Sequence, residues 1–149
     1  MLRQFLLEPT RLASQREEYG VTSNQIAEFY CTISNIGLFL VALYYHDYAT
    51  FFAALFSTLS HAFPYQRLHD LDIIGVVGVG LRVIYYRHAL YKYPTVIVIG
   101  GVALLINLID TWVTRRYLKR VGPWLHVVWH LSITFALYKF NEAVEMFHG

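Results

Sequence analysis

Five polar side chains occur in two short stretches of an otherwise apolar chain, and their types suit the chemistry of hydrolysis. Ser57 and His61 are four residues apart, so on a helix they share one face. Asp72 follows a short polar connector and could face the same point from the next helix. His126 and His130 repeat the four-residue spacing near the other end of the chain. Such groups are costly between apolar helices unless they have partners, so we expect the two stretches to meet at one site.

Three imidazoles with an open fourth position form a ligand set of catalytic zinc, which lowers the pKa of bound water towards about 7. His126 and His130 would supply two ligands from one helix face, and His61 the third from another helix. Asp72 would then either support the metal ligands from behind or act as the base that takes a proton from the water. Ser57 would hold the water or donate a hydrogen bond to a developing oxyanion. These residues predict metal-assisted hydrolysis of an amide or ester inside a membrane, with a lipid as substrate.

Each residue also has a purely structural interpretation, which the sequence leaves open. Ser57 would ordinarily pack between helices and bond to its own helix backbone, and Asp72 could cap the N-terminus of its helix. His69 lies in the connector and could replace His61 as a ligand. Asp110 could simply pair with one of the two arginines that follow it, Arg115 and Arg116.

The composition is typical of an integral membrane protein. Hydrophobic residues make up 56% of the 149 and charged residues only 15%, which is far from an ordinary soluble composition. A net charge of +2 is too small for nucleic acid to be a partner. The single cysteine, Cys31, excludes an internal disulfide and, alone, a cysteine-based zinc site. The first 27 residues lack the apolar core of a signal peptide, so the first spanning helix is expected to act as the insertion signal.

The apolar runs predict an all-α integral membrane protein, a bundle of five transmembrane helices. Residues 1–27 are expected to form a polar or amphipathic arm, 28–140 the helical bundle and 141–149 a C-terminal tail. The predicted spans are 28–46, 48–65, 71–87, 93–111 and 123–140. Glycines that would let helices approach closely are Gly75, Gly78, Gly80, Gly100 and Gly101.

The distribution of basic residues predicts a multi-pass topology. Eight of the 12 Lys and Arg residues fall on the side that carries the N-terminal arm. The other side carries Arg82, expected to snorkel out of its helix, together with Arg87, Lys92 and Lys139. The bias places the N-terminus in the cytosol and the C-terminus outside. The five candidate site residues then lie near the cytosolic face.

The same residues resemble a known family, the alkaline ceramidases, within the seven-helix membrane hydrolases that include the adiponectin receptors. Residues 26–36, Ile-Ala-Glu-Phe-Tyr-Cys-Thr-Ile-Ser-Asn-Ile, resemble the stretch that enters the family's first helix. The spacing of Ser57, His61 and Asp72 is similar to its Ser/His/Asp motif, and His126 with His130 to its C-terminal pair. The resemblance implies that the three histidines bind zinc, that Ser57 and Asp72 attend the water, and that the substrate is ceramide, cleaved to a sphingoid base and a fatty acid.

The chain departs from the family in two respects. The family has seven spans, whereas five are expected here, so this would be a shortened version of the fold with a smaller or more open lipid pocket. Because two helices is an even number, both motifs stay on one membrane face. The family also binds calcium with acidic residues and an Asn before its first helix. Glu17 and Glu28 match, but Tyr19 stands in place of the Asn, so these three residues are interpreted as a vestigial calcium site.

Two other functions remain open. One is a catalytically inactive helical bundle that binds sphingolipid or a partner membrane protein, which the shortened bundle favours. The other is a bis-histidine haem protein that uses His61 and His130.

Overall fold

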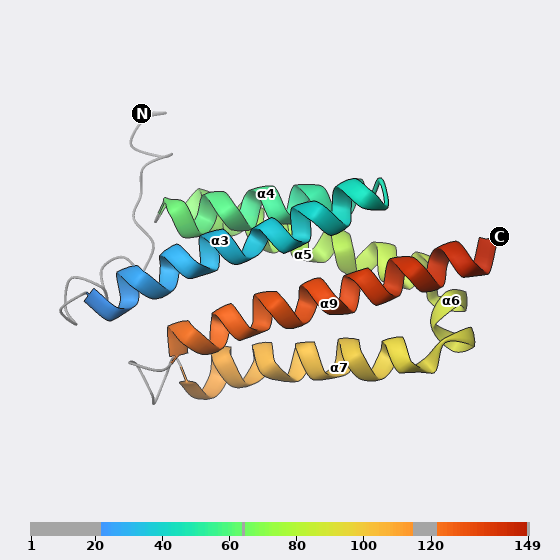
Figure 1. The fold of residues 1–149 in the computed structure, drawn as a ribbon. Helices are drawn as coiled ribbons and strands as arrows, with labels where there is room; N and C mark the ends of the chain where they lie inside the picture. The colour runs from blue at the N-terminus through green and yellow to red at the C-terminus, as the bar shows by residue number, and fades with distance from the viewer. Residues whose placement is uncertain (1–21, 64, 115–121, 149) are drawn as a thin grey trace.

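The computed structural model describes residues 22–63, 65–114 and 122–148, which are almost entirely helical (Figure 1). The helices are α3 (Thr22–Tyr44), α4 (Tyr48–Ala62), α5 (Gln66–Tyr85), α6 (Arg87–Lys92), α7 (Pro94–Ile109), the π-helical η1 (Asp110–Thr114) and α9 (Gly122–His148). No strand occurs within these ranges. The expected all-α class is therefore confirmed.

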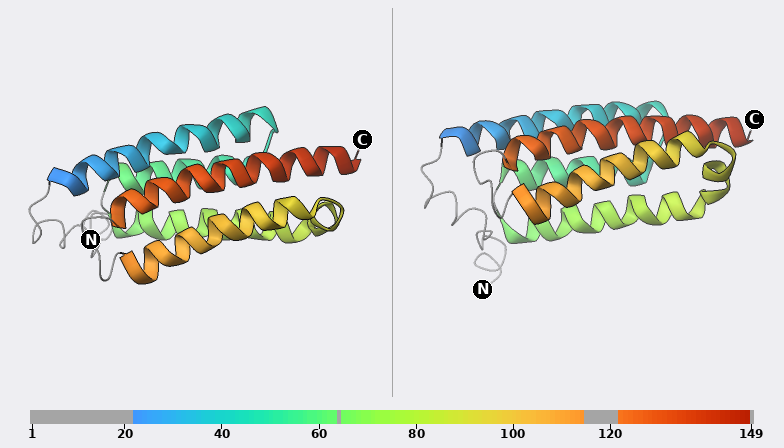
Figure 2. Two further views of the ribbon diagram at one scale, coloured as in Figure 1. Left: turned by 60° about the horizontal axis from the view of Figure 1, so that its bottom comes forward. Right: turned by 90° about the horizontal axis from the view of Figure 1, so that it is seen from below.

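The five long helices run side by side, as the views in Figures 1 and 2 agree. Helix α3 packs against α4 and α9, α4 packs against α5, and α7 packs against α9. Because successive long helices reverse direction, the starts of α3, α5 and α9 and the ends of α4 and α7 gather at one end of the bundle (Figure 1). All five candidate site residues belong to these segments. We call this end of the bundle the site end.

Several helix boundaries differ from the predicted ones. Helix α3 begins at Thr22, inside the expected arm, and the short α6 lies between two expected spans. Helix α9 continues to His148, so most of the expected C-terminal tail is helical. The side chains of Asn141 and Ala143 are 1% exposed, which means that this extension is packed against the bundle. The expected tail is therefore wrong, because polar residues in this segment lie on a helix that also has a buried face.

Close helix approach depends on two glycines, only one of which was predicted. A Cβ on Gly75 would lie 2.8 Å from the Cα of Ala53, so α4 and α5 touch there. A Cβ on Gly37, which was not predicted, would lie 2.9 Å from Cγ2 of Thr134 in α9. By contrast, a Cβ on any of the other four predicted glycines meets no atom within 4 Å: Gly78, Gly80, Gly100 and Gly101. Their predicted role in helix packing is wrong within this chain.

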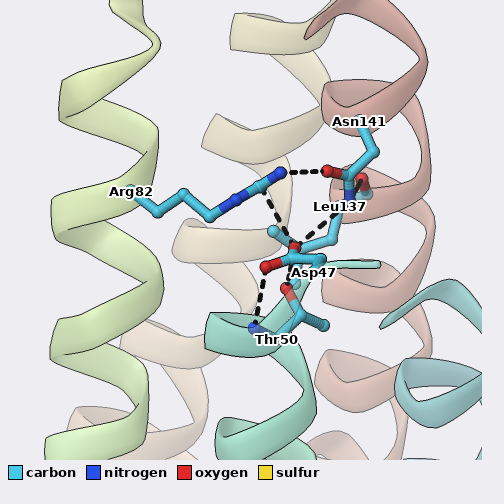
Figure 3. Close-up of polar contacts among 5 residues, drawn as sticks. All are labelled: Asp47, Thr50, Arg82, Leu137 and Asn141. Carbon is cyan, nitrogen blue, oxygen red and sulfur yellow. Dashed lines mark hydrogen bonds and ion pairs between the residues drawn. The ribbon is translucent and has the colours of Figure 1, made fainter. Parts of the chain in front are cut away.

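A buried polar network surrounds Asp47, which lies between α3 and α4 at the end of the bundle opposite the site end. Figure 3 shows its contacts. Asp47 caps α4 by accepting a hydrogen bond from the amide of Thr50. Nη1 of Arg82 lies 3.0 Å from Oδ2 of Asp47, and Nη2 of Arg82 donates to Oδ1 of Asn141. The Asn141 amide in turn donates to Asp47. Arg82 thus points into the bundle rather than snorkelling outwards, because a fully buried carboxylate attracts it.

Within the described residues, one helical stretch, Pro94–Trp112, is long and apolar enough to cross a membrane. Helix α5 is interrupted by five charged or imidazole side chains: Arg67, His69, Asp70, Asp72 and Arg82. One such stretch does not establish a membrane location, since core helices of soluble proteins can be equally apolar.

Candidate metal centre

Three imidazole rings meet at the site end of the bundle. His61 comes from the last turn of α4, and His126 and His130 from the first turns of α9. The ring centroids are 4.9 Å apart for His61 and His126, 5.0 Å for His61 and His130, and 4.7 Å for His126 and His130. The rings therefore occupy the corners of a nearly equilateral triangle. This proximity agrees with the spacing argument, while their role as metal ligands stays a prediction.

Two of the three rings, those of His61 and His126, have the nitrogen separation of a zinc site. Two nitrogens bound to one tetrahedral zinc at about 2.0–2.1 Å lie about 3.3 Å apart. Nε2 of His61 and Nε2 of His126 are 3.2 Å apart. Centroids of imidazoles on one such zinc would lie about 5 Å apart, close to the separations above. A haem held by His61 and His130 would need the two imidazoles on opposite faces of a flat ring, whereas their centroids are only 5.0 Å apart.

A buried carboxylate orients one of the rings. Oδ2 of Asp110 lies 2.8 Å from Nδ1 of His126, and the Asp110 side chain is 0% exposed. If Nδ1 donates its proton to the carboxylate, Nε2 keeps the lone pair that a metal needs. Asp110 stands where α7 passes into the π-helical η1, an irregularity common at functional sites. Sequence reasoning considered only the following arginines, which lie outside the described residues, as its partners.

A second ring is held through the backbone of α3. Nδ1 of His130 lies 3.1 Å from the carbonyl oxygen of Cys31 and 2.9 Å from Oγ of Ser34. Oγ of Ser34 itself donates to the same carbonyl at 2.8 Å. Because the Cys31 carbonyl oxygen can only accept a hydrogen bond, it favours the His130 tautomer that is protonated at Nδ1. The lone pair that a metal needs is then on Nε2. Neither Cys31 nor Ser34 was predicted at the site; their spacing of three residues places them on one helix face but does not indicate a partner.

Ser57 and Asp72 lie on the wall of a cavity of about 450 Å³ that His130 also lines. Ser57 is 5% exposed, and its Oγ accepts a hydrogen bond of 3.3 Å from Nδ2 of Asn35. Asp72 lies within the second turn of α5 rather than at its N-terminus, so capping does not explain it. The remaining wall is mostly apolar, and includes Leu38, Val76, Val83, Ile97, Leu104 and Phe140. The cavity therefore combines a polar end with a long apolar body.

A thiol also lies at the site. One ligating atom each from Cys31, His61 and His126 can be chosen so that all three lie within 4.8 Å of one another. Cys31 is 1% exposed. This group of three shares His61 and His126 with the triangle of imidazoles. The single cysteine was expected to exclude a cysteine-based site, but one thiol beside histidines is sufficient for a mixed ligand set.

Other candidates fall elsewhere. His69 lies on α5 and is not among the three rings that meet, so the expected ligand His61 is the one beside the pair on α9. Two histidines that were not predicted at the site, His46 and His88, lie at the opposite end of the bundle. Glu17 and Tyr19, and the side chain of Glu28, lie outside the described residues, so the vestigial calcium site stays a prediction.

Comparisons of the chain with protein-family models, with curated proteins and with solved structures gave no significant match. The chemistry of the site therefore has to be inferred from its own geometry.

Proposed function

We propose that this chain is a zinc-dependent hydrolase that cleaves the amide bond of ceramide or a related lipid amide. The observation that carries the proposal is the triangle of His61, His126 and His130, with one nitrogen-to-nitrogen separation of 3.2 Å and centroids 4.7–5.0 Å apart. Zinc held there would act as a Lewis acid and make a bound water nucleophilic near neutral pH. The chain's own residues would position the substrate and move the protons.

In this proposal Asp72 and Ser57 act on the reacting groups from the cavity wall. A carboxylate oxygen of Asp72 would accept the proton of the attacking water and return it to the departing amine. Oγ of Ser57, held by Asn35, would donate a hydrogen bond to the carbonyl oxygen as negative charge develops there. Asp110 would keep His126 in the tautomer that binds metal and strengthen its basicity.

A lipid substrate is supported by the distribution of polarity. Among the residues that the structure describes, the largest side chains exposed by less than 2% are His130, Asn35, Asn141, Thr50, Asp110 and Cys31. Large apolar side chains instead cover the outside; Leu81 on α5 is 62% exposed and Val98 on α7 is 66% exposed. An apolar exterior that encloses buried polar groups suits a bundle surrounded by lipid tails. We therefore propose a multi-pass membrane location, with the site end at the cytosolic face.

The apolar body of the cavity supports a long-chain substrate. On α9 it extends from His130 to Phe140, a rise of about 15 Å for ten helical residues. An acyl chain in the apolar part would bring its amide to the polar end, next to Ser57 and Asp72. Small water-soluble amides would leave most of this wall unfilled and bind weakly.

Metal content and hydrolysis should be measured on detergent-purified protein. Wild type is expected to hold close to one zinc per chain and to release fatty acid from ceramide, whereas His126→Ala loses both. His69→Ala is the matched control, because it removes a histidine outside the triangle; it should keep zinc and activity. Hydrolysis by zinc-free protein would refute the proposal. Absence of zinc from correctly folded wild type would favour the alternative, an inactive bundle that binds sphingolipid or a membrane partner.

A further inference from the structure

Cys31 is placed where a metal held by His61 and His126 would meet its sulfur. Its side chain is 1% exposed, and a ligating-atom trio with His61 and His126 fits within 4.8 Å. Three groups contact its carbonyl oxygen: Oγ of Ser34 at 2.8 Å, Nδ2 of Asn35 at 3.2 Å and Nδ1 of His130 at 3.1 Å. The backbone of Cys31 is thereby tied to the third histidine, His130, while its thiol lies beside His61 and His126.

We propose that the Cys31 thiol is a fourth ligand of the metal bound by His61, His126 and His130, and that it closes the site in the resting protein. The proposal rests on the proposed function, since it concerns the same metal. Catalytic zinc sites keep one position open, whereas zinc with four protein ligands is closed to substrate. The thiol would lose its proton to solvent when the metal binds, and the thiolate would occupy the position that the reacting water needs.

The required movement is small. A sulfur and a nitrogen on one tetrahedral zinc lie about 3.5 Å apart, given bond lengths of about 2.3 Å and 2.0–2.1 Å. The trio is already within 4.8 Å, so a shift of the sulfur by about 1 Å closes the gap. Rotation about the Cα–Cβ bond of Cys31 can supply such a shift without moving α3. The thiolate would be a displaceable ligand, leaving when substrate brings water into the cavity.

A buried cysteine commonly acts as a small apolar side chain with no ligand role. That role predicts no change in the metal's coordination when the sulfur is removed. The ligand role predicts that removal of the sulfur changes the spectrum of the bound metal, which can be measured independently of hydrolysis.

Cobalt(II) in place of zinc distinguishes the two roles. We expect the wild-type cobalt protein to show the visible absorption of a tetrahedral ion together with a sulfur-to-cobalt charge-transfer band in the near ultraviolet. Cys31→Ser should lose the charge-transfer band and keep the visible absorption of the histidine-bound ion. Visible absorption without a charge-transfer band in wild type would overturn the proposal and leave the proposed function intact. Failure of folded wild type to bind cobalt or zinc would overturn both.

X-ray absorption at the zinc edge of wild type needs no variant. We expect one sulfur per zinc at about 2.3 Å beside nitrogens at about 2.0–2.1 Å, and a shell of nitrogen and oxygen alone would overturn the proposal.

The closing role has a separate readout in kcat/KM for ceramide. Cys31→Ser and Cys31→Ala should both raise it by roughly two-fold or more, because substrate no longer displaces a ligand. A fall in kcat/KM in both variants would overturn the closing role.

Discussion

Oδ2 of Asp110 lies 2.8 Å from Nδ1 of His126, so the end of α7 orients a histidine on α9. Outer carboxylates of this kind typically contribute 10–100-fold to metal affinity. Asp110→Asn preserves the shape but removes the charge, and we expect the dissociation constant for zinc to rise by about tenfold or more. Competition with a zinc-sensitive dye would measure it. Asp70→Asn, which alters a partly exposed carboxylate paired with Arg67, is the control and should leave the constant unchanged. Equal affinity of Asp110→Asn and wild type would contradict the role of Asp110.

Ser57 and Asp72 are proposed to act on the substrate rather than to hold the metal. Ser57→Ala and Asp72→Asn should therefore keep wild-type zinc content while kcat falls by about 10²-fold or more. Thr58→Ala is the control for Ser57, since Oγ1 of Thr58 only donates to the carbonyl of Ala54 in its own helix. Zinc loss in either site variant would instead make that residue part of the metal-binding set.

Two glycines are expected to set the length of the acyl chain. Gly80 on α5 and Gly101 on α7 line the cavity, and a Cβ on either meets no atom within 4 Å. Gly80→Leu should fold normally and shift the preference among ceramides towards shorter acyl chains, by roughly tenfold in relative kcat/KM. Gly78→Leu is the matched control, because Gly78 has the same open surroundings but does not line the cavity. An identical acyl-chain preference for Gly80→Leu and wild type would show that the acyl chain does not lie beside Gly80.

The Arg82–Asp47 pair predicts a stability effect remote from the metal. The side chain of Arg82 is 19% exposed and that of Asp47 is 0% exposed. Arg82→Met leaves a buried carboxylate without its cation, which should lower the free energy of unfolding by about 3–5 kcal/mol. Adding Asp47→Asn should recover part of this loss. Titration with SDS in mixed micelles would measure both values.

Lys139→Met is the comparison for this buried pair. Nζ of Lys139 lies 2.7 Å from Glu142, but both side chains are more than a third exposed. Solvent screens exposed pairs of this kind, so the free energy of unfolding should hardly change. Equal losses for Arg82→Met and Lys139→Met would show that burial does not distinguish the two pairs.

Removal of the metal should lower thermal stability, because the site joins α4 to α9. A ligand at a hundredfold excess over its dissociation constant stabilises the folded state by about 2.7 kcal/mol. We expect dipicolinate to lower the Tm of wild type and added zinc to restore it. The Tm of His126→Ala should not respond to either treatment. If dipicolinate does not change the Tm of wild type, no metal links the two helices.

The sequence by itself determined the helical class and the local geometry of the site. His126 and His130 had to share one helix face because the α-helical repeat places residues four apart on the same side. Chain reversal between successive helices then brought the end of α4 and the start of α9 to one end of the bundle. These inferences depend only on periodicity and on where the apolar runs stop, both of which are properties of neighbouring residues.

Only the tertiary structure decided which distant groups became partners. Asp110 and His126 are near in sequence, yet their contact depends on how α7 packs against α9. Cys31 is distant from His61 and His126, so no spacing rule could place its thiol there. Arg82 could equally have reached solvent, and the buried carboxylate of Asp47 drew it inwards. Packing of five helices, with close approach at Gly75, selects these contacts because charge and hydrogen-bonding groups inside the bundle must satisfy one another.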